Sequence, residues 1–318
     1  METKVDNTKE KKPKKKLPKW ATITLTAGAV VIAVGGGVAT GLILSSLLSG
    51  VDDIDYENLT ITDYEDDIPA LMKKYENTSA SDYLSTFNPY ELANIARYKT
   101  EQHNNFISVG YGLVNAALGI KQTIRSYYVK DGDEYFFENI SKSSFVDVNW
   151  RFYQQDGQVD TYVGKGKTID TATWPNTPEA QQTLDEYAED WGRNLSRSSI
   201  FIISSKTVLL DQSSAELDGD KINISLELDP ITSVLRYVKQ MKSTSDLPKY
   251  PVFHKMHLDF VLDKELNLLS TKTGEAYDVQ AMGVTSKNTT ASLEEFLYYD
   301  NDYQIPDLQT DCDYTKGE

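Results

Sequence analysis

The sequence predicts an α+β fold in which amphipathic helices cover a large antiparallel β-sheet, preceded by one transmembrane helix. Three observations predict it. Residues 20–51 contain no charged side chain, several later segments alternate apolar and polar residues, and others repeat apolar residues every three or four positions. A period of two is typical of strands and a period near 3.6 of helices. Strands with one apolar and one polar face predict a sheet that is covered on one side only.

The N-terminal region predicts a single membrane span with its N-terminus in the cytoplasm. Residues 1–19 contain eight Lys and three acidic residues, and the uncharged segment that follows exceeds the ~20 residues that span a bilayer core. Lys-rich flanks remain cytoplasmic. We therefore expect a basic cytoplasmic tail over 1–19 and a transmembrane signal-anchor helix over 20–50, with the rest of the chain outside the cell membrane. Cleavage near Ser49 and Gly50 is the alternative, although a secretory signal has an apolar region of only ~7–15 residues.

Features of this region predict contacts with lipid and with a second copy of the chain. The Lys-rich tail can rest on anionic lipid of the inner leaflet. Gly37 and Gly41 form a small-residue pair that would let two transmembrane helices pack closely as a homodimer, although glycine is common in such helices. Leu48-Ser49-Gly50 resembles the end of a bacterial lipoprotein signal, but Val51 occupies the position of the lipid-bearing cysteine. These features together suggest a bacterial cell envelope.

The remainder of the chain is predicted to form one acidic extracytoplasmic domain. Of 32 basic and 48 acidic residues, 24 and 45 follow residue 19, which gives a net charge near −21 there. Such a surface repels nucleic acid, so no nucleic-acid partner is expected. Residues 51–84 predict an acidic stalk with a short helix over 68–75, residues 85–300 the domain, and residues 301–318 a polar tail. The single cysteine, Cys312, lies in this tail, so no intramolecular disulfide can form.

Three helix starts combine a capping residue with proline at the first helical position. Asn88-Pro89 begins one helix, and Glu91 completes its capping box. Thr177-Pro178 is predicted to begin a second helix that ends at Gly192, and Asp229-Pro230 a third. The apolar stripes are Leu92, Ile95 and Ala96 in the first helix; Ala180, Leu184, Ala188 and Trp191 in the second; and Ile231, Val234, Leu235, Val238 and Met241 in the third.

Three Asp-Gly pairs between strand-like runs predict tight type I′ hairpins, because both central residues of that turn need positive φ. They are Asp131-Gly132, Asp156-Gly157 and Asp218-Gly219. Strands are further predicted over 145–153, 222–228, 252–262, 267–281 and 289–299. The apolar faces of the first three are Val146, Val148, Trp150 and Phe152; Ile222, Ile224, Leu226 and Leu228; and Val252, Met256, Leu258, Phe260 and Leu262.

No catalytic motif is found, so the chain is predicted not to be an enzyme and to need no cofactor. His254 and His257 lie three apart on a predicted strand and so point to opposite faces, His254 toward the apolar one. A zinc site needs three or four converging ligands, and no third partner is evident, so no metal is expected. Two carboxylates can cleave a glycosidic bond. The pairs that would favour this activity are Asp147 with Asp160 and Glu134 with Glu138.

All 20 Tyr and all 10 Phe lie after residue 50, many of them in adjacent pairs. Aromatic residues pack well on sheets, which is the simpler explanation. They also line ligand sites, because a tyrosine ring combines a large contact area with a polar tip. If the sheet curls, a gap between its apolar face and the helices would accept acyl chains. The predicted ligand-contacting residues are Tyr127, Tyr135, Phe137, Trp150, Phe152, Leu235, Met256 and Phe260.

The arrangement over 85–300 resembles the bacterial LolA/LppX-type lipoprotein-carrier superfamily at the level of pattern. The stretches LELDPITSVLRYVKQM and YPVFHKMHLDFVLDKELNLLSTKTGEAYDV carry the similarity, as a strand, an Asp-Pro helix, and a strand that ends in a turn. The resemblance implies that the large antiparallel sheet is curved and half-barrel-like, a half-open sheet wrapped around helices, with a cavity that shelters acyl chains. It transfers no individual residue. A chain held by its own helix also departs from a carrier that shuttles.

We therefore expect a membrane-anchored, non-catalytic extracytoplasmic protein that binds a lipid, a lipopeptide or another apolar ligand. The alternative is an interaction module that binds another envelope protein or a wall polymer through a Tyr-rich surface. The position of the tyrosines distinguishes the two hypotheses. Ligand binding places them inside the domain, and a scaffold places them on its outer face.

Overall fold

The computed structural model describes residues 52–116, 121–143, 147–164, 173–192, 194–245, 247–281 and 284–299. The predicted cytoplasmic tail, the predicted transmembrane helix with Gly37 and Gly41, and the C-terminal tail with Cys312 lie outside these ranges. Within them, every helix is too short or too polar to cross a bilayer. The described residues thus belong to the predicted domain and to the acidic segment before it.

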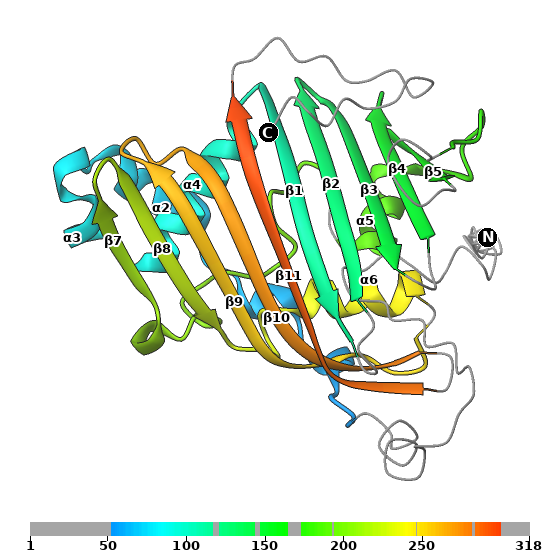
Figure 1. Ribbon diagram of the computed structural model, residues 1–318. Coiled ribbons are helices and arrows are strands. Elements are labelled where there is room, and N and C mark those ends of the chain that lie inside the picture. Colours follow the sequence, from blue (N-terminus) through cyan, green and yellow to red (C-terminus); the bar gives the residue numbers. More distant parts are fainter. Residues whose placement is uncertain are drawn as a thin grey trace, which may run out of the picture.

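Eleven strands of the described residues form one curved antiparallel sheet (Figure 1). On one side the strands follow one another from β1 to β6, and on the other side from β11 back to β7. The two halves meet where β1 pairs with β11, so the first and last strands lie at the centre. The strands are β1 (Asn105–Asn115), β2 (Lys121–Asp131), β3 (Glu134–Ser143), β4 (Asp147–Gln155), β5 (Gln158–Gly164), β6 (Ala180–Thr183), β7 (Ser214–Asp218), β8 (Lys221–Leu228), β9 (Val252–Asp263), β10 (Leu268–Ala281) and β11 (Val284–Tyr299).

The helices lie behind the sheet in the view of Figure 1, on one of its faces. α4 (Pro89–Gln102) packs against β8 and β10, while α5 (Leu184–Trp191) packs against β5, β6 and α6 (Leu235–Ser245). α2 (Ile68–Glu76) packs on α4, and α3 (Tyr83–Thr86) directly precedes α4. Short 3-10 helices are η2 (Tyr56–Asn58), η3 (Ile61–Tyr64), η4 (Ala80–Asp82) and η7 (Leu210–Gln212). The prediction of an α+β fold with a large, curved antiparallel sheet covered by helices is confirmed.

The sheet buries apolar residues on both faces, whereas the sequence predicted one apolar and one polar face. The helix-covered face holds the main core, which includes Leu92 and Ile95 of α4. The opposite face of β1–β3 holds a second cluster, formed by Ile107, Val109, Tyr127, Val129, Phe136 and Ile140. Adjacent apolar pairs such as Tyr127-Tyr128 supply both faces, because successive side chains of a strand point in opposite directions.

Helix α5 begins at Leu184 and not at Thr177-Pro178, so that prediction was wrong. Residues 180–183 pair with β5 and form the edge strand β6, which delays the helix. Thr183 is the cap: its Oγ1 accepts a hydrogen bond from the Glu186 N–H at 3.3 Å, and the Glu186 carboxylate accepts one from the Thr183 N–H at 3.0 Å. This is a complete capping box. The helix ends at Gly192, as predicted, with a φ of 72°.

Helix α6 begins at Leu235, later than the Asp229-Pro230 pair predicted. The Asp229 carboxylate accepts hydrogen bonds from the N–H groups of Ile231 (3.1 Å) and Thr232 (2.7 Å), which holds a separate turn before the helix. The starts of α2 and α4 are as predicted. At α4, the Asn88 N–H donates to the Glu91 carboxylate at 2.8 Å.

All three Asp-Gly pairs lie at hairpins, but of the three only Asp156-Gly157 forms the predicted type I′ turn. Asp156 and Gly157 both have positive φ, 52° and 75°, and connect β4 to β5 as in a type I′ turn. In the other two hairpins the loop residues are Gly132-Asp133 and Gly219-Asp220. There the glycine has positive φ and the aspartate does not, which is the pattern of a type II′ turn. In these two hairpins the strand pairing is shifted by one residue from the prediction, which changes the turn from type I′ to type II′.

The strand β1 and a bulge in β9 were not predicted. Lys255 pairs with Ala276 and Phe253 pairs with Tyr277, so His254 between them has no partner in the ladder. The bulge turns His254 to the exposed side, where its Nε2 lies 3.2 Å from the Asp278 carboxylate. The predicted apolar orientation of His254 was therefore wrong.

The segment 52–82, predicted to form a stalk, lies against the domain. Tyr56 is fully buried, and its ring meets the Tyr250 ring edge-on at 5.3 Å. Polar contacts join the acidic residues of the segment to the domain. They are Asp53 with Lys249, Glu57 with Tyr250, Glu65 with Arg236, and Asp66 with Ser205. The negative charges of this segment are thus partly neutralised by basic residues of the domain.

Candidate ligand-binding cavity

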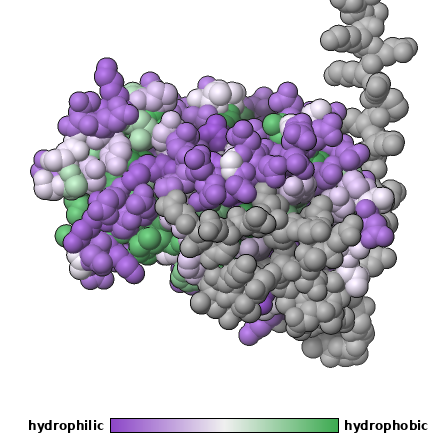
Figure 2. Space-filling model, turned by 90° about the horizontal axis from the view of Figure 1, so that it is seen from above, coloured by the Kyte–Doolittle hydropathy of each residue, from purple (hydrophilic) through white to green (hydrophobic). Residues whose placement is uncertain are grey.

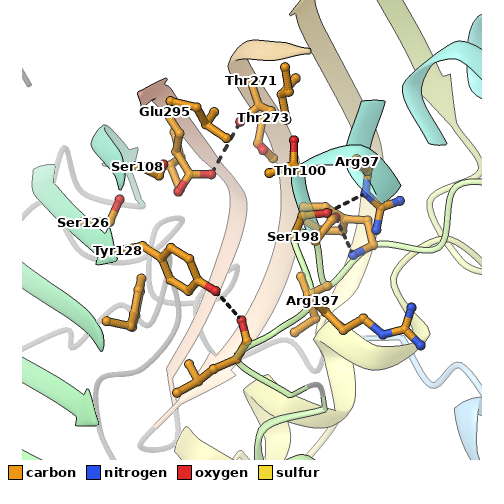
Figure 3. Close-up of a pocket in the computed structure, with 18 of the residues that line it drawn as sticks. Arg97, Thr100, Ser108, Ser126, Tyr128, Arg197, Ser198, Thr271, Thr273 and Glu295 are labelled. Carbon is orange, nitrogen blue, oxygen red and sulfur yellow. Dashed lines mark hydrogen bonds between the residues drawn. The ribbon is translucent and has the colours of Figure 1, made fainter. Parts of the chain in front are cut away.

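A cavity of about 220 Å³ lies between the helix-covered face of the sheet and the helices α4, α5 and α6 (Figure 3). Strands β1–β4 and β9–β11 form its floor, and the segment 195–201 closes one side. The centre of the sheet, where β1 pairs with β11, therefore lies directly under the cavity.

The β3–β4 end of the cavity is aromatic. The Phe152 ring lies 4.6 Å from the Trp191 ring and 6.0 Å from the Phe137 ring, and Tyr187 stacks on Trp191 at 5.6 Å. Tyr187 and Trp191 are four residues apart on α5, so they share one helix face. The β9–β11 end is lined by Leu258, Phe260, Leu268 and Leu297. Two apolar ends thus face each other across the floor.

A row of polar side chains crosses the floor between these ends. The strand registers place Thr271, Glu295, Gly110, Ser126 and Asn139 directly opposite one another on β10, β11, β1, β2 and β3. Directly opposed residues of antiparallel strands share a face, and the four with side chains line the cavity. The Thr271 hydroxyl donates a hydrogen bond to Glu295 at 3.5 Å. We call these five residues the polar row.

Gly110 leaves the space in which Ser126 and Glu295 approach each other. A Cβ atom at position 110 would lie 2.1 Å from Ser126 Oγ and 3.0 Å from Glu295 Cγ, so a side chain there would displace both. Ser126 is 3% exposed, and its Oγ has no hydrogen-bond partner among the described residues. A buried hydroxyl without a partner is unfavourable by about 1–3 kcal/mol. Ser126 also lines the cavity, so a ligand with a polar group beside it would supply the missing partner.

A second acidic residue, Glu275, lies on the floor next to α6. Burial raises the pKa of the Glu275 carboxyl to about 8, which keeps it protonated at neutral pH. Tyr237 of α6 donates its hydroxyl to Glu275 Oε2 at 3.4 Å. Burial also raises the pKa of Tyr237 well above its ordinary value. This part of the floor therefore carries no charge at neutral pH, which suits an apolar ligand.

The segment 195–201 is held on both sides of the cavity. Tyr128 of β2 donates its hydroxyl to the carbonyl of Leu195 at 2.8 Å, as Figure 3 shows. On the other side, Arg97 Nε donates to Ser198 Oγ at 3.3 Å, and the Glu101 carboxylate accepts from the N–H of Ser198 at 2.9 Å. Both Arg97 and Glu101 belong to α4. The segment is thus a fixed part of the cavity wall.

A second, more polar hollow of about 780 Å³ adjoins the cavity. The two share Arg97, Arg197, Ser199 and Phe201 in their walls. The second hollow also contains Glu65, Asp66 and Arg236. In Figure 3, Arg97 and Arg197 lie across the cavity from Ser126 and Glu295. An apolar cavity and a charged hollow are therefore neighbours, which suits a ligand with an apolar and a polar part.

The structure distributes the predicted ligand-contacting residues over four places. Phe137, Phe152 and Phe260 line the cavity. Trp150 and Tyr135 pack behind its aromatic end, and Leu235 and Met256 are fully buried in the main core. Tyr127 lies on the opposite face of the sheet, in the second apolar cluster. Its neighbour Tyr128 faces the cavity instead, because the pair Tyr127-Tyr128 alternates between the faces.

Sequence reasoning missed the polar row and Glu275. One signal was present for Ser126, which lies between the inward-facing Ile124 and Tyr128 and so interrupts an apolar face of β2. Glu275 and Glu295 had no such signal, since β10 and β11 carry polar residues on both faces.

Of the other residues considered for chemistry, those whose side chains the structure describes lie away from the cavity. His257 points to the polar face of β9, as predicted, between the carboxylates of Glu227 (2.9 Å) and Asp259 (2.8 Å). Glu138 forms a buried ion pair with Arg151, and Glu134 accepts a hydrogen bond from Gln155 at 2.9 Å. Asp160 accepts one from Gln181 at 3.0 Å. In the described ranges, no group of His, Cys, Asp and Glu is placed to hold a metal ion.

Comparison with known proteins finds similarity to solved structures and no similarity of sequence. No protein-family profile and no curated protein sequence matches the chain. Among solved structures, the chain is similar to the LolA superfamily protein NE2245 from Nitrosomonas europaea, at 11% identity and a TM-score of 0.24, over 69% of this chain and 93% of that one. It is also similar to a β-barrel-like protein of the domain of unknown function DUF1849 from Brucella abortus, at 7% identity and a TM-score of 0.17, over 62% and 98%. At these values, neither similarity supports a statement about what this chain binds.

Proposed function

We propose that the domain binds the apolar chain of a lipid, a lipopeptide or a comparable ligand, without catalysing a reaction. The observation that supports it is the cavity, which lies beneath three helices and has aromatic and aliphatic walls. Mostly apolar hollows with a few converging polar groups are typical of small-molecule sites. The walls of the cavity are mostly apolar, and Glu275, Glu295 and Ser126 are among its polar groups.

The size of the cavity limits how much of a ligand it encloses. Its volume of about 220 Å³ exceeds the ~150 Å³ of an apolar cavity that accepts benzene. It is smaller than the ~300–1,000 Å³ of pockets that enclose drug-sized ligands. A segment of one acyl chain therefore fits, and a whole phospholipid does not. The rest of such a ligand would extend into the polar hollow that contains Arg97 and Arg197.

We further propose that residues 20–50 hold the domain at the outer side of a bacterial cell membrane. The uncharged segment and the eight Lys before it support this orientation. A tether of this kind keeps the domain beside the bilayer from which an acyl ligand would come. Dimerisation through Gly37 and Gly41 and binding of the Lys-rich tail to anionic lipid stay predictions.

An interaction module is the second candidate, since tyrosines also gather on the opposite face of the sheet. Tyr111, Tyr153 and Tyr298 pack around the second apolar cluster, and Phe296 is 36% exposed. Seen from above, the described surface is mostly hydrophilic, with hydrophobic side chains in smaller areas (Figure 2). On the face that holds these tyrosines, the exposed large apolar side chains of β1 and β11 are Leu113 and Phe296, which lie apart in the strand register. A partner-binding face usually offers one contiguous apolar patch. The cavity, with Tyr128, Tyr187 and Tyr237 in its wall, therefore favours ligand binding.

Trp191 allows a direct test, because its ring lines the cavity. The full chain with the substitution Trp20→Phe is placed in phospholipid nanodiscs and titrated with a fatty acid brominated midway along its chain. Bromine quenches the fluorescence of nearby indole rings. We expect quenching that saturates and that an unbrominated fatty acid of the same length reverses.

The matched variants are Ser108→Leu and Ser292→Leu. Ser108 lines the cavity, so leucine there fills it, whereas Ser292 is exposed on β11. Quenching should weaken several-fold in the first variant and stay unchanged in the second. Quenching that does not saturate and is equal in both would mean that the fatty acid enters only the bilayer, and would contradict the proposed function.

A further inference from the structure

We infer that the cavity selects an acyl chain that carries a hydroxyl group, and that Ser126 and Glu295 bind this hydroxyl. The inference rests on the proposed function and makes its ligand more specific. The observations that carry it are the polar row, the absence of a side chain at Gly110, which lets Ser126 and Glu295 converge there, and the buried hydroxyl of Ser126.

A cavity for an unsubstituted acyl chain needs only apolar walls. The floor of this cavity also carries polar side chains, because the polar row crosses it from the aromatic end to the aliphatic end. Figure 3 shows Ser126 and Glu295 across the cavity from Arg97 and Arg197. The polar row would therefore contact the middle of a bound acyl chain, and the two arginines would contact its head group.

The two side chains offer complementary groups at one point. Glu295 supplies carboxyl oxygens that accept hydrogen bonds, and Ser126 supplies a hydroxyl that donates one. They converge above Gly110, where a Cβ atom would lie 2.1 Å from Ser126 Oγ and 3.0 Å from Glu295 Cγ. A ligand hydroxyl can donate to Glu295 and accept from Ser126 at the same time. Its two hydrogen bonds would also supply the partner that Ser126 Oγ lacks among the described residues.

Charged groups fit this position less well. A ligand carboxylate would lie beside the Glu295 carboxyl and be repelled if both were ionised. A ligand ammonium would have to lose its water in a cavity whose burial already raises the pKa of Glu275 to about 8. A neutral hydroxyl has neither cost. The chemistry of the polar row therefore favours a hydroxylated chain over an amine of equal length.

The test compares matched ligands in the nanodisc assay. The brominated fatty acid is displaced from the full chain by stearate, 12-hydroxystearate, myristate, 3-hydroxymyristate or tetradecylamine. At least one hydroxylated acid should displace it at a concentration about tenfold lower than its unsubstituted counterpart, as one or two additional hydrogen bonds imply. Equal displacement within both pairs, or strongest displacement by the amine, would overturn the inference.

Variants assign the preference to the two residues. Ser126→Ala and Glu295→Gln should each bring the affinities for the hydroxylated and unsubstituted acids close together. Glu294→Gln, one residue along β11 and exposed on the other face, should keep the preference. Thermal melting establishes that each variant is folded. A preference that survives in both cavity variants would overturn the assignment, whereas the absence of any saturable binding would contradict the proposed function itself.

Discussion

Glu275 is 8% exposed on the floor of the cavity, and burial raises the pKa of its carboxyl from 4.5 to about 8. Between these two values the unfolded chain releases the proton and the folded domain keeps it. The domain therefore loses up to ~1.4 kcal/mol of stability per pH unit over this range. The contribution of this carboxyl to the unfolding free energy is fully present below about pH 4. It is lost as the pH rises to about 8.

Glu275→Gln should remove this pH dependence, because the amide cannot titrate and still accepts the hydrogen bond from Tyr237. We expect the variant to exceed the wild type in unfolding free energy by about 3 kcal/mol at pH 7, with little difference at pH 4. Urea unfolding between pH 4 and pH 8 measures both. Glu294→Gln, an exposed substitution, should retain the wild-type slope. An unchanged slope in Glu275→Gln would show that the folded domain keeps this carboxyl ionised.

At the same scale, the sequence identified the aromatic side chains of the cavity more readily than the polar ones. Phe152 was predicted because β4 alternates clearly, and it does line the cavity. Thr271, Lys272 and Thr273 are consecutive polar residues on β10, so alternation does not reveal which of them face inward. The roles of Glu275 and Glu295 depend on the register with neighbouring strands, which a single sequence does not contain.

Among the elements, α5 carries Tyr187 and Trp191 to the cavity, and its start depends on Thr183. Thr183→Ala removes the acceptor of the capping box and should lower the unfolding free energy by about 1 kcal/mol. Affinity for the brominated fatty acid should fall with it, because the first turn of α5 frays. Thr177→Ala is the control, since Thr177 is exposed and does not begin the helix. Equal destabilisation by both substitutions would contradict the observed helix start.

The elements that were predicted well are those whose signals are local. Asn88-Pro89-x-Glu91 starts α4 because the cap and its helix are adjacent in the sequence. Thr177-Pro178 has a similar pattern, yet pairing of residues 180–183 with β5 overrides it. Strand β1 was missed because Gly110 and Gly112 take the place of inward-facing side chains and interrupt its alternation.

For the whole molecule, the position of the cavity follows from the meeting of the two halves of the sheet. β1 and β11, far apart in the sequence, pair at the centre. On its inner face β1 carries Ser108, which lines the cavity, and Gly110 and Gly112, over which side chains of β2 and β11 lean. Bulky residues of β4 and β9 surround the cavity. The hollow thus depends on a long-range pairing, which periodicity along one strand could not predict.

The segment 52–82 determines how closely the domain is held to any anchor that precedes it. Tyr56 is fully buried against the domain, and it follows the end of the predicted transmembrane helix by only a few residues. Tyr56→Ala removes a buried ring, at a cost of about 3 kcal/mol, and should release residues 52–64. Hydrogen exchange on the full chain would then show faster exchange of these amides, while the strands remain protected.

Tyr56→Phe separates the packing of this ring from its hydroxyl. Its Oη is buried without a hydrogen-bond partner in the described part of the chain, so the substitution should leave the segment docked and its exchange slow. If Tyr56→Ala also exchanged slowly, the ion pairs Asp53–Lys249 and Glu65–Arg236 would be the main attachment. In that case 1 M salt, which shortens the screening length to about 3 Å, should release the segment. Release by Tyr56→Ala at low salt would instead show that apolar packing fixes the segment to the domain and so holds the domain close to the proposed anchor.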